Sequence, residues 1–423
     1  MKTNKTLKGS FILALILMMA VFAAACGGNN GNSEPSASSD NTSNNGGEAV
    51  EKVELKVATW AGAGELSEFE ELVSGLNAKS DQYEIEIQSI PADYYQKLQT
   101  MIAGKQAPDF MWLSQEHIPQ YAKLGVLQPL DELLKETDGF NRDDYFDGAY
   151  NVSVYQEQAY ALPWISQPYM LYFNQDMFEE AGVEVPANDW TWEQFIAAGE
   201  KLTKDGQWGA LLNNMPLPMF MWSYGGDTFD ENGDIVLGEE GAIKGLEMYQ
   251  RIASSGIAPE RATADSMGGA DMFKTGKVGM FMGGAGDDLE KTVSFNVGMA
   301  VPPKGTEQVT FSWIGVTAMS KSTENPEVAA QALVDMTQAM HEWKVPAPTK
   351  TALDLIAEAR PDKAYAVDTI RAASEVARGF NNQPQQAEID TMIWEKLTQP
   401  LEQGEDVQKA VDETVEKFEK IIK

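Results

Sequence analysis

Short apolar runs of strand length alternate with amphipathic segments of helix length through the roughly 375 residues that follow Ala49. This alternation is typical of α/β folds, in which strands and helices follow one another along the chain. The segment is too long for one typical hydrophobic core, so it predicts two domains. The expected strands fall at 53–60, 83–90, 109–113, 159–164, 169–174 and the end of 272–282, and the main expected helices at 66–78, 94–103, 191–203, 241–254, 327–340 and the C-terminus.

The first 25 residues have the order of features of a secretory signal peptide. Three lysines precede an apolar run at 11–22, which is shorter than the roughly 20 residues of a membrane-spanning helix. Three alanines, residues 23–25, then lead to Cys26, which resembles a bacterial lipobox with Ala23 in place of the usual leucine. Cleavage there would leave Cys26 as a lipidated N-terminus carrying diacylglycerol and palmitate. The alternative is an ordinary cleavable signal followed by a chance cysteine.

Residues 26–49 contain almost no apolar side chain beyond Cys26 itself, so we expect a flexible tether between the lipid and the folded body. The whole chain carries a formal net charge of −32. Removing the signal takes away three lysines and no acid, which leaves the processed chain near −35. A field of that sign repels nucleic acid and anionic lipid headgroups. The single cysteine also rules out an internal disulfide.

Motifs of common catalytic and metal sites are missing or incomplete, so we expect no catalytic residue, cofactor or metal. The chain has no P-loop, and the glycine-rich run 283–288 lacks dinucleotide-binding spacing. An EF-hand-like start at 230–234 has Ile235 where the loop needs glycine. The triplet 274–276 matches a β-lactamase element, but its SxxK partner is absent.

Tryptophan is the most informative residue type in this chain, which has ten. The ligand crevice of an open α/β sheet lies at the carboxyl ends of its strands, and four tryptophans end or follow expected strands: Trp60, Trp112, Trp164 and Trp313. A fifth, Trp222, lies in an apolar stretch. An indole offers a flat apolar face with an N–H donor at its edge, which suits the C–H face and hydroxyl rim of a sugar. Core packing is the alternative for each of them. The predicted ligand-binding residues are Trp60, Trp164, Trp222 and Trp313, with Glu65, Glu116, Asn214 and Asp287 as polar neighbours.

Taken together, these segments resemble the carbohydrate-type extracellular solute-binding proteins of ABC importers, the group related to maltodextrin-binding protein. The resemblance extends over nearly all of 53–423. The segments that carry it are 95–110 (YQKLQTMIAGKQAPDF), 121–134 (YAKLGVLQPLDELL), 161–164 (ALPW), 171–182 (LYFNQDMFEEAG), 191–195 (TWEQF), 273–284 (FKTGKVGMFMGG) and 325–334 (NPEVAAQALV).

The resemblance implies a two-lobed periplasmic-binding-protein-like fold with a ligand cleft between the lobes and three crossings of the chain. The first lobe would comprise 50–165 and 303–344, and the second 166–302 and 345–423. The lobes would close on the ligand by hinge bending. Family ligand contacts correspond to Trp60 with its neighbours to Glu65, to Gln115 and Glu116, to Trp164, to the loop at 284–288 and to the polar run 381–386. Maltodextrin binders have a stacking tryptophan where this chain has Gly286, which argues against a maltose-like specificity.

We therefore expect a non-enzymatic, monomeric lipoprotein on the extracellular face of the cell membrane of a Gram-positive bacterium. It would bind a carbohydrate, with an oligosaccharide favoured, and deliver it to ABC transporter permease subunits. The alternatives are a binder of another polar solute such as a polyol, a secreted lipoprotein glycoside hydrolase, and an adhesive surface lipoprotein. The many carboxylates leave the hydrolase open, because a glycosidase needs only two of them.

Overall fold

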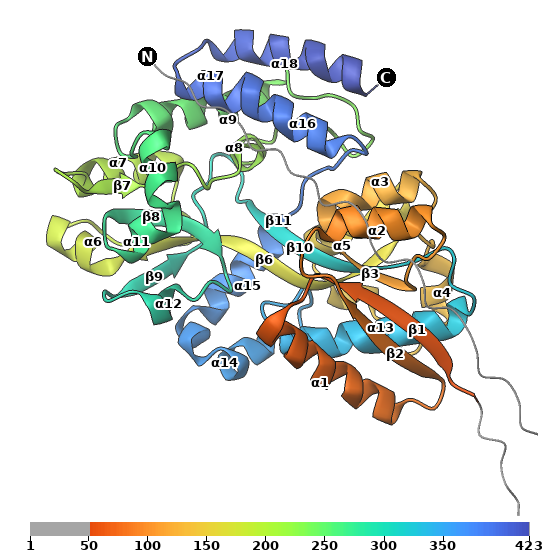
Figure 1. Ribbon diagram of the computed structural model, residues 1–423. Helices are drawn as coiled ribbons and strands as arrows, with labels where there is room; N and C mark the ends of the chain where they lie inside the picture. Colours follow the sequence, from red (N-terminus) through yellow and green to blue (C-terminus); the bar gives the residue numbers. More distant parts are fainter. Residues whose placement is uncertain (1–50, 423) are drawn as a thin grey trace, which may run out of the picture. The chain divides into compact units, whose positions relative to one another are not determined.

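One mixed β-sheet runs through the protein in the computed structural model, which describes residues 51–422 (Figure 1). Its main path has the order β2-β1-β3-β10-β6-β8-β7, while β9 pairs with β6 and β11 pairs with β10. The strands β1, β2 and β3 are parallel, whereas β10 is antiparallel to both β3 and β6. The strand bounds are β1 Val53–Thr59, β2 Tyr83–Ser89, β3 Phe110–Ser114, β6 Ala161–Asn174, β7 Trp208–Ala210, β8 Val278–Gly284, β9 Val297–Ala300, β10 Thr310–Met319 and β11 Ala377–Arg378.

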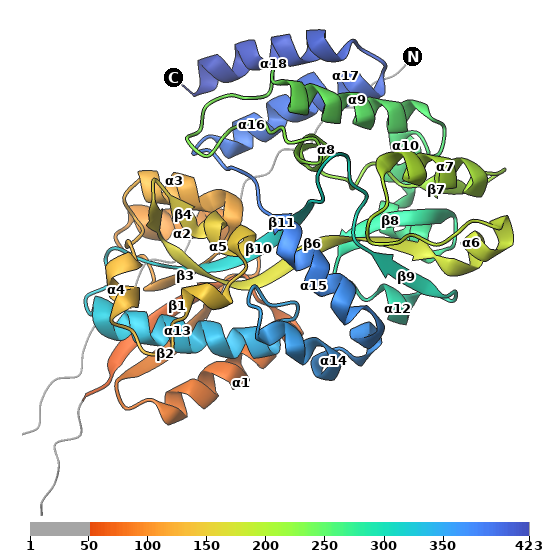
Figure 2. The same ribbon diagram turned by 180° about the vertical axis from the view of Figure 1, so that it is seen from behind.

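Helices pack around each end of this sheet, and each end with its helices forms one lobe (Figures 1 and 2). The part of the molecule built on β1–β3 is called the first lobe. In it, α1 (Ala63–Lys79) and α13 (Pro326–Trp343) pack on the strands. The second lobe is built on β7–β9, with α9 (Glu240–Ser254) packed against α18 (Val407–Ile421). The fold class expected from the sequence, α/β with two lobes, is confirmed. The lobe boundaries stay a prediction.

The helix caps and the buried helix face that the sequence predicts are present in the structure. Asn174 caps α6 (Gln175–Ala181), and the helix ends at Gly182, whose φ of 63° is the left-handed conformation that favours glycine. Thr191 and Gln194 form a complete capping box at the start of α7 (Trp192–Leu202). The C-terminal helix buries Val407, Val411 and Phe418 along one face, as its spacing predicts.

The strands expected separately at 159–164 and 169–174 are one strand, β6, of 14 residues. The prediction was wrong because Pro163 and Pro168 remove backbone donors and look like breaks in a strand. Both prolines nevertheless lie in register with β10, opposite Val316 and Ser312, and the pairing shifts at a bulge between Gly315 and Val316. The part of β6 up to Pro168 pairs with β10, and the part from Tyr169 on pairs with β8 and β9. One continuous strand therefore serves both lobes.

Three segments that lie far apart in the sequence meet at Ser166 in the middle of β6. Its hydroxyl forms a buried hydrogen bond of 2.9 Å with the hydroxyl of Ser312 on β10. Its backbone N–H donates to the carbonyl of Pro346, 3.2 Å away, in the segment that follows α13. This segment, β6 and β10 are therefore hydrogen-bonded to one another at a single residue.

A buried lysine fixes the loop that follows β8. The side chain of Lys363 is 1% exposed, and its Nζ lies 2.5 Å from Oε2 of Glu290. It also donates to the carbonyl of Asp287, at 2.6 Å, and to the hydroxyl of Tyr172, at 3.1 Å. Arg360 adds a bond of 2.9 Å to the carbonyl of Gly286. The loop is thus attached to the segment 360–363, far from it in sequence.

His341 on α13 makes the stability of the fold depend on pH. Its Nε2 lies 2.9 Å from the carbonyl of Pro163, and burial lowers the pKa of the imidazole from 6.5 to about 4, against the opposing effect of that hydrogen bond. The unfolded chain therefore binds a proton at a higher pH than the folded chain, and stability is lost as the pH falls below about 6.5. From pH 7 to pH 5 we expect His341 to remove about 2 kcal/mol.

Urea unfolding of wild type and His341→Gln at pH 7 and pH 5 checks this prediction. Glutamine can still donate to Pro163 but does not titrate, so the variant should lose about 2 kcal/mol less than wild type over this range. Other groups titrate equally in both proteins and cancel in the difference. An identical pH dependence in the two proteins would contradict the assignment.

Within the part that the structure describes, no helix has both the length and the apolar character needed to cross a bilayer. The predicted signal peptide at 1–25, the lipidation of Cys26 and the tether at 26–49 all lie outside the described residues, and they stay predictions.

Candidate functional site

Four tryptophans form one cluster where β1, β3, β6 and β10 lie side by side. The ring of Trp60 lies 5.4 Å from Trp112, 6.4 Å from Trp164 and 6.5 Å from Trp313, measured between centroids. Trp112 and Trp164 are buried, with 0% and 2% of their surface exposed, whereas Trp60 and Trp313 are half-buried. The cluster therefore has a core-facing layer and a layer of two rings that reach the surface.

Polar groups from the end of β3 and from the turn after it join the exposed layer of this cluster. Nε1 of Trp313 donates to Oγ of Ser114 at 3.0 Å, and that hydroxyl donates in turn to the carboxylate of Glu116. This chain of bonds fixes the indole of Trp313 and the Glu116 carboxylate relative to each other. Beside them, the imidazole of His117 stacks on the ring of Tyr95 at 3.7 Å, and burial lowers the pKa of His117.

A row of aromatic rings continues from Trp313 into the second lobe. Phe311 lies two residues before Trp313 on β10, so both side chains point to the same face of the strand. Its ring stacks on Phe380 at 4.5 Å and meets the edge of Tyr169 at 5.1 Å. Phe380 in turn contacts Trp222 at 5.6 Å. Trp313, Tyr169 and Phe380 are half-buried, so the row presents aromatic surface from both lobes.

A partly buried ion pair lies beside the second-lobe end of this row. Arg378 on β11 bonds to Oδ2 of Asp227 at 2.8 Å, and its guanidinium lies 4.6 Å over the ring of Trp222. Asn381 donates to the same carboxylate oxygen at 3.1 Å. Burial raises the pKa of Asp227, while the neighbouring Arg378 opposes that rise.

A cavity of about 250 Å³ opens beside α16 (Gln386–Ile393) and the Phe380 end of the row. Gly379, next to Phe380 in the lining, lies close to the first lobe, because a β-carbon at that position would be 2.5 Å from Oε1 of Gln115. A π-helical turn, Trp394–Thr398, follows α16, and such turns occur frequently at functional sites. The lining residues are Pro216, Leu217, Pro218, Asp227, Thr228, Phe229, Phe380, Asn381, Gln386, Ile389, Asp390, Ile393, Trp394 and Thr398.

Asp390 on α16 supplies a carboxylate to the lining of this cavity. Its pKa is raised mainly by burial and to a smaller extent by the negative charge of Glu116, while a hydrogen bond from Gln386 opposes the rise. Glu116 belongs to the first lobe, in the 3₁₀ turn Gln115–His117 after β3.

The structure brings together four of the eight predicted ligand-binding residues: Trp60, Trp164, Trp313 and Glu116. Trp222 joins them only through Phe380 and Phe311, and it is 2% exposed, as is Trp164. Glu65 lies apart, in an ion pair of 3.1 Å with Lys344. Asn214 donates to the carbonyl of Met282, and Asp287 accepts from the N–H of Gly284 at 3.1 Å, so both lie beside β8. Their roles as ligand contacts stay predictions.

Residues that the sequence reasoning did not single out complete the region. Ser114, Phe311, Phe380 and Arg378 belong to no motif that would have indicated them. Asn381 and Gln386 belong to the polar run expected to contribute a contact, and both line the cavity.

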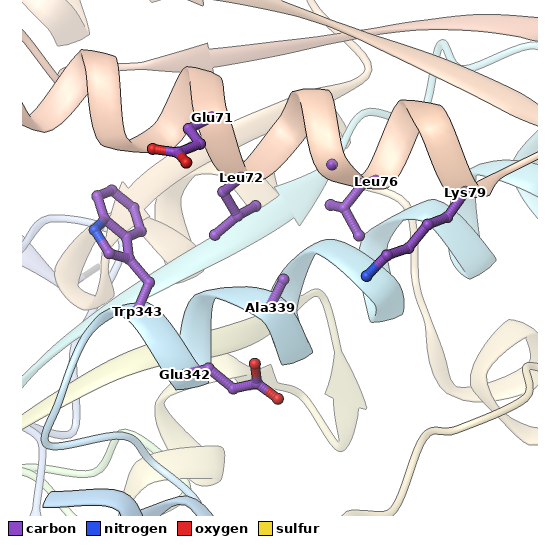
Figure 3. A pocket seen from close by; sticks show the side chains of 8 residues that line it. Glu71, Leu72, Leu76, Lys79, Ala339, Glu342 and Trp343 are labelled. Carbon is purple, nitrogen blue, oxygen red and sulfur yellow. The ribbon is translucent and has the colours of Figure 1, made fainter. Parts of the chain in front are cut away.

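A second hollow lies between α1 and α13 of the first lobe. It has a volume of about 360 Å³, and Figure 3 shows Leu72 and Leu76 of α1 facing Ala339 of α13 across it, with Trp343 and Lys79 at opposite ends. None of the eight predicted ligand-binding residues lines it.

The chemistry available at the aromatic row is recognition by stacking and by hydrogen-bond acceptors. Among residues 51–422, no group of three or more His, Cys, Asp or Glu side chains is placed to hold a metal ion. A hydrolytic alternative would need a pair of carboxylates at this site.

Comparison with known proteins places this chain in a family. Residues 62–338 match the family described as bacterial extracellular solute-binding protein, and the chain belongs to it. A binding protein of Brucella abortus strain 2308 is 25% identical over 282 residues, which cover 63% of this chain and 67% of the relative. The arabinooligosaccharide-binding protein of Halalkalibacterium halodurans is 26% identical over 213 residues, covering 47% of this chain and 46% of the relative.

A solved structure supports the fold. The ABC substrate-binding protein of Listeria monocytogenes, determined in complex with cycloalternan, superposes with a TM-score of 0.73 at 23% identity, covering 88% of this chain and 99% of that one. The two-lobed fold of these binding proteins is therefore the fold of this chain.

Proposed function

We propose that this protein captures a carbohydrate, an oligosaccharide in particular, between its lobes and delivers it to the permease of an ABC importer. The observation that carries the proposal is the aromatic row, in which half-buried rings of Trp60 and Trp313 continue through Phe311 to Phe380 and Tyr169. Aromatic faces suit the C–H faces of sugar rings, and a row of them suits several linked rings. The carboxylates Glu116 and Asp390 supply acceptors for sugar hydroxyls.

The crossing segments support closure of the lobes by hinge bending. In this proposal the lobes comprise 50–165 with 303–344 and 166–302 with 345–423, and they pivot where Ser166 bonds to Ser312 and to the carbonyl of Pro346. A few residues can absorb such a rotation while the packed cores move as units. The lipid on Cys26 and the tether at 26–49 would hold the protein at the outer face of the membrane, within reach of the permease.

A ligand panel tests the proposal. Mono- and oligosaccharides, polyols and sugar phosphates are each added in excess, and the melting temperature is recorded. A ligand at 100 times its Kd should stabilise the folded state by about 2.7 kcal/mol, so we expect a clear rise with at least one oligosaccharide. Chromatography of the same mixtures should recover the sugar intact. Release of a shorter sugar would favour the hydrolase, and a shift with polyols alone would favour the other solute class.

A further inference from the structure

We infer that the groove between α1 and α13 binds an outer loop of the importer's membrane permease, one that carries an apolar side chain next to a lysine or arginine. The inference rests on the proposed delivery of sugar to a permease, and it names the surface of this chain that the permease contacts. The groove has a volume of about 360 Å³, and its lining comes from α1 and α13 alone (Figure 3). It is therefore formed by the first lobe without help from the second.

A glycine in the interior of α1 keeps the groove open. Gly75 is exposed and lines the groove. Apart from its own helix and chain neighbours, a β-carbon there would have no atom of the described chain within 4 Å, so internal packing does not require glycine. Glycine inside a helix costs roughly 0.5–1 kcal/mol relative to alanine. The missing side chain thus leaves room for an occupant from outside that approaches the helix backbone closely.

The floor of the groove is apolar and held in place. Leu72 and Leu76 of α1 face Ala339 of α13 across it, and all three are half-buried. At one end the ring of Trp343 stacks on the ring of Phe69, with 5.8 Å between the centroids. A fixed hollow of this kind favours insertion of one apolar side chain of a partner as an anchor.

Two exposed carboxylates flank this apolar floor, one from each helix. They belong to Glu71 and Glu342, and neither has an ion-pair partner among residues 51–422. The two helices are also acidic as a whole, because α1 has four acids and one lysine, and α13 has three acids and no lysine or arginine. A partner with a cation beside its apolar anchor is therefore attracted, whereas a second copy of this acidic chain or an anionic lipid surface is repelled.

The chain enters the fold at the other end of the groove. Nζ of Lys52 donates to the carbonyl of Asn77 at 2.9 Å, and the N–H of Val53 donates to the carbonyl of Gln82 at 2.9 Å. Both acceptors lie within three residues of Lys79, which lines that end (Figure 3). A flexible segment of 24 residues, the length of the predicted tether, spans about 25–30 Å on average. A lipid-anchored tether would hold this face within that distance of the membrane, so its position favours a membrane protein as the partner.

The experiment measures docking separately from sugar binding. The probe is a purified ABC sugar importer of the source organism in nanodiscs, and its ATP hydrolysis is recorded against increasing concentrations of the sugar-loaded chain 26–423. Every protein carries Cys26→Ser, because attachment to the same membrane would raise the effective concentration and mask differences in affinity. Calorimetry gives the sugar affinity of each variant.

Two pairs of variants test the shape and the charge of the groove. Gly75→Leu fills it, and Gly75→Ala is the matched control, because both residues favour a helix but alanine adds only a methyl group. We expect the concentration for half-maximal ATP hydrolysis to rise about tenfold in Gly75→Leu and less than threefold in Gly75→Ala. Glu342→Lys should raise it about fivefold, whereas Glu247→Lys, the same change on an exposed residue of α9, should raise it less than twofold. All four variants should bind sugar as tightly as wild type.

The outcomes separate this inference from the proposed function. Equal stimulation by Gly75→Leu and Gly75→Ala, or by Glu342→Lys and Glu247→Lys, would overturn the docking inference and leave the proposed function standing. A loss of sugar affinity in Gly75→Leu that accounts for its weaker stimulation would overturn the inference as well. If sugar-loaded wild type stimulates no such importer, delivery to a permease is wrong and the docking inference falls with it.

Discussion

Replacing Lys363 with methionine should lower the free energy of unfolding by about 3–5 kcal/mol, which is the usual cost of removing one partner of a buried ion pair. The Lys363 side chain is 1% exposed and that of Glu290 is 12% exposed, so the remaining carboxylate would keep its charge in a poorly solvated place. The variant also loses the bonds of Nζ to the Asp287 carbonyl and the Tyr172 hydroxyl. Urea unfolding at pH 7 measures the change.

Two further variants make the test specific. Lys291 is 52% exposed and pairs with Asp288 at 3.1 Å, so Lys291→Met should cost no more than about 1 kcal/mol. The double variant Lys363→Met with Glu290→Leu removes both charges, and it should recover a large part of the loss, because an apolar pair can replace a buried ion pair of similar volume. A double variant as unstable as Lys363→Met alone would show that the cost does not come from the unpaired Glu290.

Replacing Trp313 with alanine should weaken carbohydrate binding roughly tenfold to thirtyfold, or about 1.4–2 kcal/mol. Trp313 is half-buried, contacts Trp60 and lies on the same face of β10 as Phe311, so its loss interrupts the aromatic row. Trp313→Phe keeps a ring but loses the bond to Ser114, and it should fall between wild type and alanine. Calorimetric titration with the sugar selected in the panel gives the affinities.

Trp208 provides the matched control for this experiment. It is also a half-buried tryptophan, but it lies on β7, at the second-lobe end of the sheet and away from β10. Trp208→Ala should leave the affinity for sugar unchanged. An equal loss of affinity in both variants, or no loss in Trp313→Ala, would mean that the row is not the binding surface.

The sequence predicted the fold class because it depends on short-range patterns. Alternating apolar residues marked β1 and β2, and caps such as Asn174 and Thr191 marked helix starts. The continuous strand β6 was not predicted, since its two prolines disrupt the local pattern while the pairing with β10 comes from residues about 150 positions away.

The site was harder to predict than the fold, for a related reason. The sequence could nominate Trp60, Trp164 and Trp313 by residue type and position, but it could not tell a buried indole from a half-buried one. That difference depends on which rings pack beneath which, as Trp112 and Trp164 do beneath Trp60. Phe311 and Phe380 gave no local signal at all, because their place in the aromatic row comes only from neighbours that are remote along the chain.

The position of β10 in the sheet has a consequence for how the chain acquires its structure. This strand separates β3 from β6, and its residue Val316 is paired with Leu113, about 200 positions earlier. When β1, β2, β3 and β6 have been synthesised, β10 has therefore not yet been made, although it is the strand that joins β3 to β6. Helix α13, which packs on β2 and β6, is also still missing at that stage. The N-terminal two thirds of the polypeptide cannot complete its first lobe alone, so the native sheet closes only late in synthesis, and slowly, as a long-range pairing requires.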